Sequence, residues 1–168
     1  MSAALRRGLT WLLAVVLALV LGLFFAGQAG MLTGTPPVDL GVNGGRLKPP
    51  SMTSNSVSSQ AALYAGHPQQ AGAQIAPLPL QGPPAETIGR LAVVVRGMPG
   101  AVVVAQRDDY LYVQFTTRWL HFVDDAEFWA DPASGAVQVR SASRLGRKDR
   151  GVNRARIGQI RAALAAAP

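Results

Sequence analysis

The sequence predicts an α+β protein, in which an N-terminal transmembrane helix precedes a small domain with a mainly antiparallel sheet of four to five strands and two helices. Three patterns predict this architecture. Residues 9–26 are eighteen consecutive residues without a charge. Apolar residues recur at helical spacing after residue 84 and again after residue 150, and at every second position between residues 101 and 143. Helices packed on one face of an antiparallel sheet then form a single core.

The composition limits the chain to one soluble domain. Of its 168 residues, 16 are basic and 9 are acidic, which gives a net charge of +7. Two of the basic residues, Arg6 and Arg7, precede the apolar segment, so the remainder carries +5. The part after this segment has room for a single core of roughly 100 residues. The sequence has no cysteine, which excludes a disulfide framework, a cysteine nucleophile, a thiolate metal site and a lipidated cysteine.

Residues 9–26 predict a helix that spans a membrane. At about 1.5 Å per residue the segment covers about 27 Å, which is enough to cross a hydrocarbon core. Arg6 and Arg7 precede it, and the next basic residue is Arg46. This asymmetry predicts that residues 1–8 remain in the cytoplasm and that the rest of the chain is exported.

A cleaved signal peptide is the alternative to a transmembrane anchor over residues 9–29. Residues 27–29 offer the small side chains that a signal peptidase recognises. The apolar run is longer than the about 7 to 15 residues usual in signal peptides, which favours the anchor. Both alternatives export the domain.

Residues 30–72 are predicted to form an extended tether. Gly, Pro, Ser, Thr and Asn dominate this segment, and no apolar period persists in it. Such a segment buries too little apolar surface to offset the entropy of ordering it. The folded domain is therefore expected over residues 73–168. Its first stretch, residues 73–80, is apolar but contains two prolines, which favours an edge strand or an extended arm.

The first helix of the domain is expected to begin near Pro83 or Pro84 and to stop at Pro99. Proline suits the first turn of a helix but cannot continue one. The apolar face of this helix consists of Ile88, Leu91, Val95 and Met98. The alternating segments that follow predict four antiparallel strands, over residues 101–106, 110–117, 120–130 and 136–143.

A second helix is expected over about residues 150–166. Ile157, Ile160 and Leu164 define its apolar face. Asn153 falls inside that face, so we expect a buried residue that is hydrogen-bonded, because an unpaired buried amide would cost about 1 to 3 kcal/mol. Asp149 is well placed to cap the start of the helix.

The strand expected over residues 120–130 contains three acids. Alternation places Asp125 and Glu127 on one face and Asp124 on the other. If residues 131–135 form a tight turn, Glu127 lies opposite Arg140, which can then bridge both acids of its face. A buried Asp124 would need an arginine or backbone donors. We expect ion pairs and no metal, because a metal ion needs more ligands than this strand offers.

Residues 139–165 contain eight basic residues and a single acid, Asp149. A basic loop that leads into a helix can hold a phosphate or carboxylate, although a capping Asp149 would occupy the same donors. Three interpretations remain open: solvated or structural arginines, contact with anionic lipid or cell-envelope polymer, and a small anionic ligand. Nucleic acid is not expected, because no aromatic residue lies between the basic ones. No glycine-rich phosphate loop occurs either, so no cofactor is expected.

Four segments of the chain resemble the domain of unknown function 1499 family (DUF1499). They read SNSVSSQ, IAPLPLQG, FVDDAEFWADP and VRSASRLGRKDRGVNRARI, and the resemblance covers residues 51–164. Its members are often secreted or membrane-anchored. For this chain the resemblance implies a single-pass protein of a bacterial inner membrane, with its domain on the periplasmic side. It implies no established reaction.

The resemblance also implies a candidate polar cluster formed from three parts of the chain. Its members are Asn55, Ser58, Ser59, Asp124, Asp125, Glu127, Arg140, Ser141, Ser143, Arg144, Asp149, Asn153 and Arg154. Residues 51–60 are accordingly expected to dock beside the acids and arginines. The chain departs from the family pattern in having Ser56 where a cysteine is common. It also has Arg147, Lys148 and Arg150 in place of an aromatic and small polar residues, and these three are the candidates for contact with an anionic surface.

The sequence thus predicts a membrane-anchored protein of the cell envelope. We expect a non-catalytic binding or envelope-support module with a basic edge toward anionic lipid or polymer. The alternative is an exported hydrolase, in which Asp124 or Asp125 acts as the base and Arg140 or Arg144 holds an oxyanion. The hydrolase requires a concave pocket that joins these groups.

Overall fold

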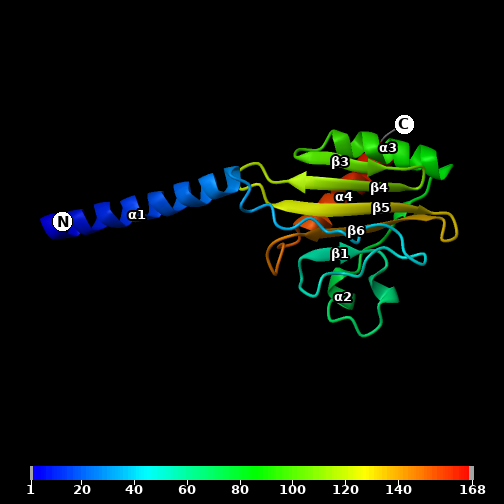
Figure 1. Ribbon diagram of the computed structural model, residues 1–168, viewed down its shortest axis with the longest axis horizontal. Helices are drawn as coiled ribbons and strands as arrows, with labels where there is room; N and C mark the ends of the chain where they lie inside the picture. Colours follow the sequence, from blue (N-terminus) through cyan, green and yellow to red (C-terminus); the bar gives the residue numbers. More distant parts are fainter. Residues whose placement is uncertain (1, 167–168) are drawn as a thin grey trace.

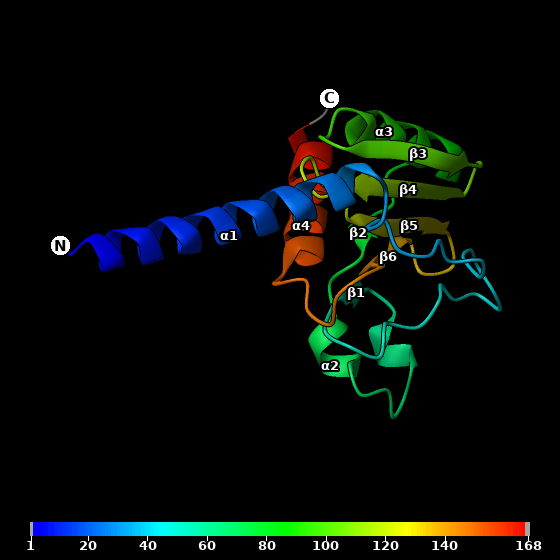
Figure 2. The same cartoon turned by 60° about the vertical axis from the view of Figure 1, so that its left-hand side comes forward.

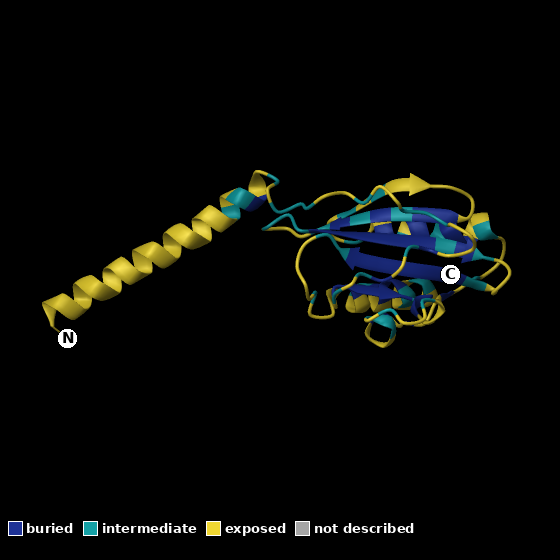
Figure 3. Ribbon diagram, turned by 60° about the horizontal axis from the view of Figure 1, so that its bottom comes forward, coloured by how far each residue is buried: buried dark blue, intermediate teal, exposed yellow. Residues whose placement is uncertain are grey.

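The computed structural model describes residues 2–166, which form one long N-terminal helix and an α+β domain (Figure 1). Helix α1 (Ala3–Gln28) extends away from the domain, roughly along the direction of the strands (Figures 1 and 2). Its side chains are exposed on all sides over most of its length (Figure 3), and its most apolar 18-residue window has a mean hydropathy of 2.7. Its 26 residues span about 39 Å. The helix is therefore long and apolar enough to cross a membrane.

A six-stranded antiparallel sheet forms the centre of the domain. The order of its strands is β1-β6-β5-β4-β3, and the short β2 also pairs with β6. The strands are β1 (Ser56–Ser58), β2 (Leu78–Pro79), β3 (Ala101–Gln106), β4 (Tyr110–Thr116), β5 (Val123–Asp131) and β6 (Ala136–Ser143). The predicted fold class is confirmed, and so are the four consecutive strands β3 to β6. β5 begins three residues later than expected, because the preceding residues form a turn in which His121 has a φ of 54°.

Two helices cover one face of the sheet, α3 (Pro84–Arg96) and α4 (Val152–Ala166). The apolar faces predicted for both helices are confirmed, because both pack into the core against the sheet. The side chains at the centre of this core are Ile88, Leu91, Val95, Leu111, Val113, Phe128, Ile157 and Ile160. We call this face the helix side of the sheet.

The segment predicted to be a tether is part of the domain, so the expected boundary at residue 73 is wrong. Ser56–Ser58 pairs with β6, and Leu47 is fully buried. Two short helical segments follow β1, namely η1 (Ala61–Leu63) and α2 (Gln70–Ala73). Backbone pairing with a strand needs no apolar period, which is why composition alone misplaced the boundary. The expected docking of residues 51–60 on the sheet is confirmed.

Residues 35–51 cross the other face of the sheet, and we call them the strap. In Figure 1 this blue and cyan segment passes in front of β5 and β6. It brings Leu47 into the interior, where the backbone N–H of Leu47 donates to Gln60 Oε1 at 2.8 Å. The polar side chains of β5 and β6 on this strap side are consequently buried although no helix covers them.

Helix α3 offers a test of the core with an internal control. We expect Leu91→Ala to lower the free energy of unfolding by about 2 to 5 kcal/mol, because the side chain is fully buried and its removal leaves a cavity. Val93 lies on the same helix but is 70% exposed, so Val93→Ala should change the free energy of unfolding by less than about 0.5 kcal/mol. Urea titration of the full chain in detergent micelles measures both. Equal effects of the two substitutions would contradict the assigned helix face.

Candidate functional site

Strand β5 distributes the three acids of the predicted cluster over both faces of the sheet. The predicted hairpin register is confirmed, because Glu127 pairs with Arg140 and Asp125 with Ala142. The alternation of the strand then directs Asp124 to the helix side and the other two acids to the strap side. All three acids are buried. The polar cluster predicted as a single site is therefore two separate networks.

On the helix side, Asp124 forms a buried ion pair with Arg156. The distance from Arg156 Nη2 to Asp124 Oδ2 is 2.6 Å, and the guanidinium carbon of Arg156 lies 4.5 Å from the ring centroid of Phe115. The arginine that a buried Asp124 requires is thus supplied by α4. Arg156 was not among the predicted site residues. Its position three residues after the inward-facing Asn153 places it on the same side of the helix, and this was the available signal.

Asn153 joins three segments of the chain on the helix side. It is fully buried, and its Oδ1 accepts a hydrogen bond from Ser141 Oγ. Its Nδ2 donates to Ser143 Oγ at 3.0 Å, to Asp149 Oδ2 at 3.0 Å and to the backbone oxygen of Asn55 at 3.3 Å. The predicted buried, hydrogen-bonded asparagine is confirmed. It links β6, α4 and the residue before β1.

Asp149 caps helix α4 as predicted. Its carboxylate accepts hydrogen bonds from the backbone N–H groups of Gly151 and Asn153, both at 3.0 Å. Burial by itself would raise the pKa of Asp149, but these hydrogen bonds outweigh it and hold the pKa below the usual range. The backbone N–H groups at the start of α4 already donate to the carboxylate of Asp149, so they do not form an open anion site.

On the strap side, Asp125 is held by Arg144 in a bidentate ion pair. Both hydrogen bonds, from Arg144 Nε and Nη2, are 2.8 Å long, and Tyr112 Oη donates a third at 2.5 Å. The hydrogen bonds to Asp125 raise the pKa of Arg144 above its usual value. We expected Arg140 to bridge both acids of this face. Arg144 pairs with Asp125 instead. It directly follows the end of β6, next to the start of β5, and its Nε and Nη2 each donate to one oxygen of the carboxylate.

Glu127 is completely buried beneath the strap. Its Oε1 accepts hydrogen bonds from the backbone N–H of Gly41 at 2.7 Å and from Tyr110 Oη at 2.8 Å. Its Oε2 has no hydrogen-bond partner among the described residues and lies 3.8 Å from Arg140 Nη1. Burial raises the pKa of Glu127, although the bonds from Gly41 and Tyr110 and the charge of Arg140 oppose this.

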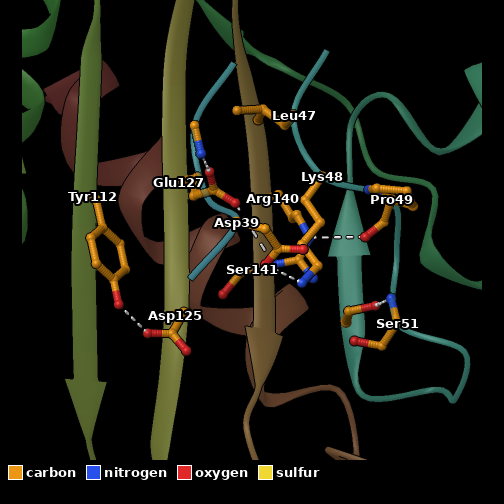
Figure 4. A network of polar contacts seen from close by, with 12 residues as sticks. Asp39, Leu47, Lys48, Pro49, Ser51, Tyr112, Asp125, Glu127, Arg140 and Ser141 are labelled. Carbon is orange, nitrogen blue, oxygen red and sulfur yellow. Dashed lines mark hydrogen bonds and ion pairs between the residues drawn. The ribbon is translucent and has the colours of Figure 1, made fainter. Parts of the chain in front are cut away.

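Arg140 is also nearly buried, with 4% of its surface exposed. Its Nε donates to the backbone oxygen of Pro49 at 3.0 Å, and burial lowers its pKa while Glu127 raises it. The pKa values of both partners are thus shifted toward the neutral forms, because loss of hydration outweighs an attraction acting over 3.8 Å. Figure 4 shows Glu127 and Arg140 beside Asp39 and Lys48 of the strap.

A cleft of about 330 Å³ lies between the strap and the end of β6. Arg140, Arg144 and Asp125 line it from the sheet, and Lys48 and Ser51 line it from the strap. This cleft joins one acid and two arginines of the predicted cluster. The other predicted residues do not line it, apart from Ser143.

The predicted serines near β1 have structural roles. Ser58 is fully buried, and its Oγ accepts from the backbone N–H of Gln60 at 3.1 Å. Ser59 Oγ accepts from the backbone N–H of Val139 at 2.8 Å, which continues the pairing of β1 with β6. Arg154 likewise serves the fold, since it donates to the backbone oxygen of Gly72 in α2 at 2.8 Å and to that of Gln74, just after α2, at 2.9 Å.

The geometry does not support the predicted hydrolase. Asp124 lies on the opposite face of the sheet from Arg140 and Arg144, so it shares no pocket with them. Asp125 does line the cleft, but each of its oxygens already accepts a hydrogen bond from Arg144. Neither carboxylate is positioned as a free general base.

The three basic residues predicted to contact an anionic surface lie in the exposed loop between β6 and α4. Arg147, Lys148 and Arg150 are all exposed, and none forms an ion pair within residues 2–166. Arg150 has a φ of 53° and precedes the helix. These side chains do not participate in either polar network.

The end of α1 contacts this same end of the domain. Gln28 Nε2 donates to the backbone oxygen of Trp119 at 3.0 Å, in the loop between β4 and β5. Gly27 approaches the next residue so closely that a Cβ there would lie 2.8 Å from the backbone of Leu120. The basic loop between β6 and α4 is adjacent to the segment that follows α1, because a Cβ at Gly34 would lie 3.1 Å from the side chain of Leu145. Helix α1 and both loops therefore lie at one end of the sheet (Figure 1).

Comparison with known proteins gives one match. Residues 46–164 match the family described as Protein of unknown function (DUF1499). The chain matches no curated protein and no solved structure. The matched region contains every strand of the sheet and both polar networks except the N-terminal part of the strap.

The buried pair of Glu127 and Arg140 can be tested by substitution. We expect Arg140→Met to lower the free energy of unfolding by about 3 to 5 kcal/mol, because it leaves a buried carboxylate without its counter-charge. Adding Glu127→Gln should recover most of the loss, since the glutamine can still accept from Gly41 and is neutral. Urea titrations of the single and double variants measure this. A double variant no more stable than Arg140→Met would refute electrostatic coupling between the two residues.

The cap of α4 predicts a pH-dependent contribution. Asp149→Ala should lower the free energy of unfolding by about 0.5 to 2 kcal/mol at pH 7 through loss of the N-cap. Because the folded-state pKa of Asp149 is lowered, its contribution is present above the unfolded-state pKa, near 3.8, and is lost as pH falls through the folded-state value. The effect of Asp149→Ala should therefore shrink at pH 2.5. Asp108→Ala, at an exposed turn, is the control and should have no effect at either pH.

Proposed function

The chain belongs to the family described as Protein of unknown function (DUF1499), and we propose that it is a single-pass membrane protein whose domain is a non-catalytic binding module. In this proposal α1 crosses the inner membrane of a bacterium, and the domain lies against the periplasmic surface. The basic loop then faces anionic lipid headgroups or an anionic polymer of the envelope.

The observation that supports this proposal is the position of the exposed basic and apolar side chains relative to α1. These side chains gather at the end of the sheet where α1 is attached, and we call this group of residues the membrane-proximal end. Its members are Arg118, Trp119, Leu145, Arg147, Lys148 and Arg150. If α1 spans a bilayer, this end is the part of the domain nearest to the headgroups.

The chemistry of the membrane-proximal end suits an interface between water and lipid. Trp119 is 62% exposed and Leu145 is 41% exposed, so both offer apolar surface to a partner. Tryptophan is enriched at the headgroup level of membranes, and Arg118, which stacks 4.9 Å from the Trp119 ring, adds a charge there. Basic side chains near an anionic surface are attracted to it within a Debye length.

Two features favour binding over catalysis. The three buried acids of β5 each lie within ion-pair distance of an arginine. The basic side chains of the membrane-proximal end form no ion pair within residues 2–166, and the one acid in the loop between β6 and α4, Asp149, caps α4. This end therefore offers charge and apolar surface for contact with a partner.

A cysteine reporter tests the proposal, because the natural chain has no cysteine. Leu145→Cys in the full chain, spin-labelled and placed in lipid nanodiscs, should be less accessible to a water-soluble relaxation agent when the lipid is anionic than when it is neutral. High salt should remove the difference, since screening weakens the attraction. Ser134→Cys, in the turn between β5 and β6 at the other end of the sheet, is the matched control and should not change.

A second variant identifies the charges that act. Replacing Arg147, Lys148 and Arg150 together with glutamine should abolish the effect of anionic lipid on the label at position 145. In the chain that keeps all three basic residues, equal accessibility of this label in neutral and anionic nanodiscs would disprove the contact with lipid.

A further inference from the structure

Arg140 has hydrogen-bonding capacity that the protein does not use. A guanidinium has five N–H donors, and only Nε is hydrogen-bonded within residues 2–166, to Pro49. The one carboxylate oxygen within 4 Å, Glu127 Oε2, lies 3.8 Å from Nη1, which is beyond hydrogen-bond distance. The four remaining N–H groups belong to a side chain that is only 4% exposed. The terminal nitrogens are not among the fully buried atoms that lack a partner, so they keep contact with the solvent of the cleft that Arg140 lines.

These donors lie beside the strap-side cleft, whose lining has more basic than acidic side chains. Three basic side chains line it, Lys48, Arg140 and Arg144, and one acid does, Asp125. Asp125 is already neutralised by its bidentate bond to Arg144. The partner of Lys48 is Asp39, which is 60% exposed and lines a neighbouring cleft instead, so this ion pair is weak.

The remaining lining fits an anion that bears a substituent. Thr35 and Ser51 bring hydroxyl groups from the strap, and Pro37, Pro50 and Met52 bring apolar surface. Arg140 approaches from the sheet and Lys48 from the strap, so donors surround the cleft from different directions. This suits the oxygens of a tetrahedral group better than a planar carboxylate. At about 330 Å³, the cleft accommodates a phosphate group with a small substituent.

We propose that the strap-side cleft is a binding site for a phosphate ester, held by the terminal nitrogens of Arg140 and by Lys48. Arginine forks bind phosphate oxygens through paired hydrogen bonds, and lysine adds a second charge. The phosphate belongs either to a lipid headgroup or to a soluble phosphorylated molecule. The lipid source is within reach, because Thr35 follows the end of α1 by seven residues, at most about 25 Å of extended chain.

This site is independent of the membrane-proximal end, since the two share no residue. A bound phosphate would connect the strap to β6, so it should stabilise the folded state by mass action. The proposal therefore predicts a thermal shift that does not depend on Arg147, Lys148 or Arg150.

Thermal unfolding of the full chain in maltoside micelles tests the site, with inorganic phosphate and glycerol 3-phosphate as probes. We expect both to raise Tm above its value in chloride at the same ionic strength. Lys48→Gln should weaken phosphate binding about tenfold or more, because it removes a charge-assisted hydrogen bond. Lys48 is partly exposed, so this variant should fold. Lys148→Gln removes the same charge at the membrane-proximal end and should leave the affinity unchanged.

Arg140→Lys tests the contribution of the paired guanidinium donors. It keeps the positive charge opposite Glu127 but removes the paired donors, so phosphate affinity should fall even where the variant folds with a native Tm. If phosphate raises Tm no more than chloride does, or if Lys48→Gln and Lys148→Gln respond alike, the site does not exist.

Short-chain phosphatidic acid added to the same micelles distinguishes the two sources, with oleate as an anionic lipid without phosphate. A Tm rise that saturates at lower concentrations of phosphatidic acid than of glycerol 3-phosphate, and that oleate does not reproduce, assigns the site to a lipid headgroup. The reverse order assigns it to a soluble phosphorylated molecule. If oleate raises Tm as much as phosphatidic acid does, and the rise persists in both Lys48→Gln and Arg140→Lys, the effect comes from the charge of the micelle and the proposal is overturned.

Discussion

The structure depends on the burial of three carboxylates on the single strand β5. A carboxylate buried away from water needs a nearby positive charge or hydrogen-bond donors, because otherwise it becomes protonated. Each of the three is met by a different part of the chain. Arg156 brings α4 to Asp124, Arg144 brings the loop after β6 to Asp125, and the backbone of the strap at Gly41 meets Glu127. The strand thus determines where three distant segments lie.

The two faces of the sheet resolve this constraint differently. On the helix side, the ion pair of Asp124 and Arg156 and the hydrogen bonds of Asn153 leave no buried side-chain atom without a partner among the described residues. On the strap side, Glu127 and Arg140 lie too far apart for a hydrogen bond, and both carry a cost of burial. Incompletely paired buried polar groups and shifted pKa values are features of many functional sites. This difference is the reason to place a ligand on the strap side.

The basic C-terminal part of the chain is not one uniform surface. Several of its arginines form contacts within the protein itself. Arg154 and Arg161 donate to backbone oxygens of residues 72–76, and Arg156 pairs with Asp124. Arg147, Lys148 and Arg150 face solvent beside the end of α1. The net positive charge of the chain therefore does not locate a binding surface. The position of these three side chains relative to α1 is what supports the proposed contact with an anionic surface.

The sequence by itself determined the elements whose signals are local. An uncharged apolar run identified α1, and apolar spacing identified α3 and α4. Alternation identified the four central strands, and a tight turn set the register that places Glu127 opposite Arg140. The cap at Asp149 and the buried Asn153 follow from one helical turn. Tertiary structure alone decided that the strap and β1 belong to the domain, that Arg156 pairs with Asp124, and that the acids form two networks. Backbone pairing and the choice of a counter-ion depend on which segments meet in space, and neither leaves a periodic trace in the sequence.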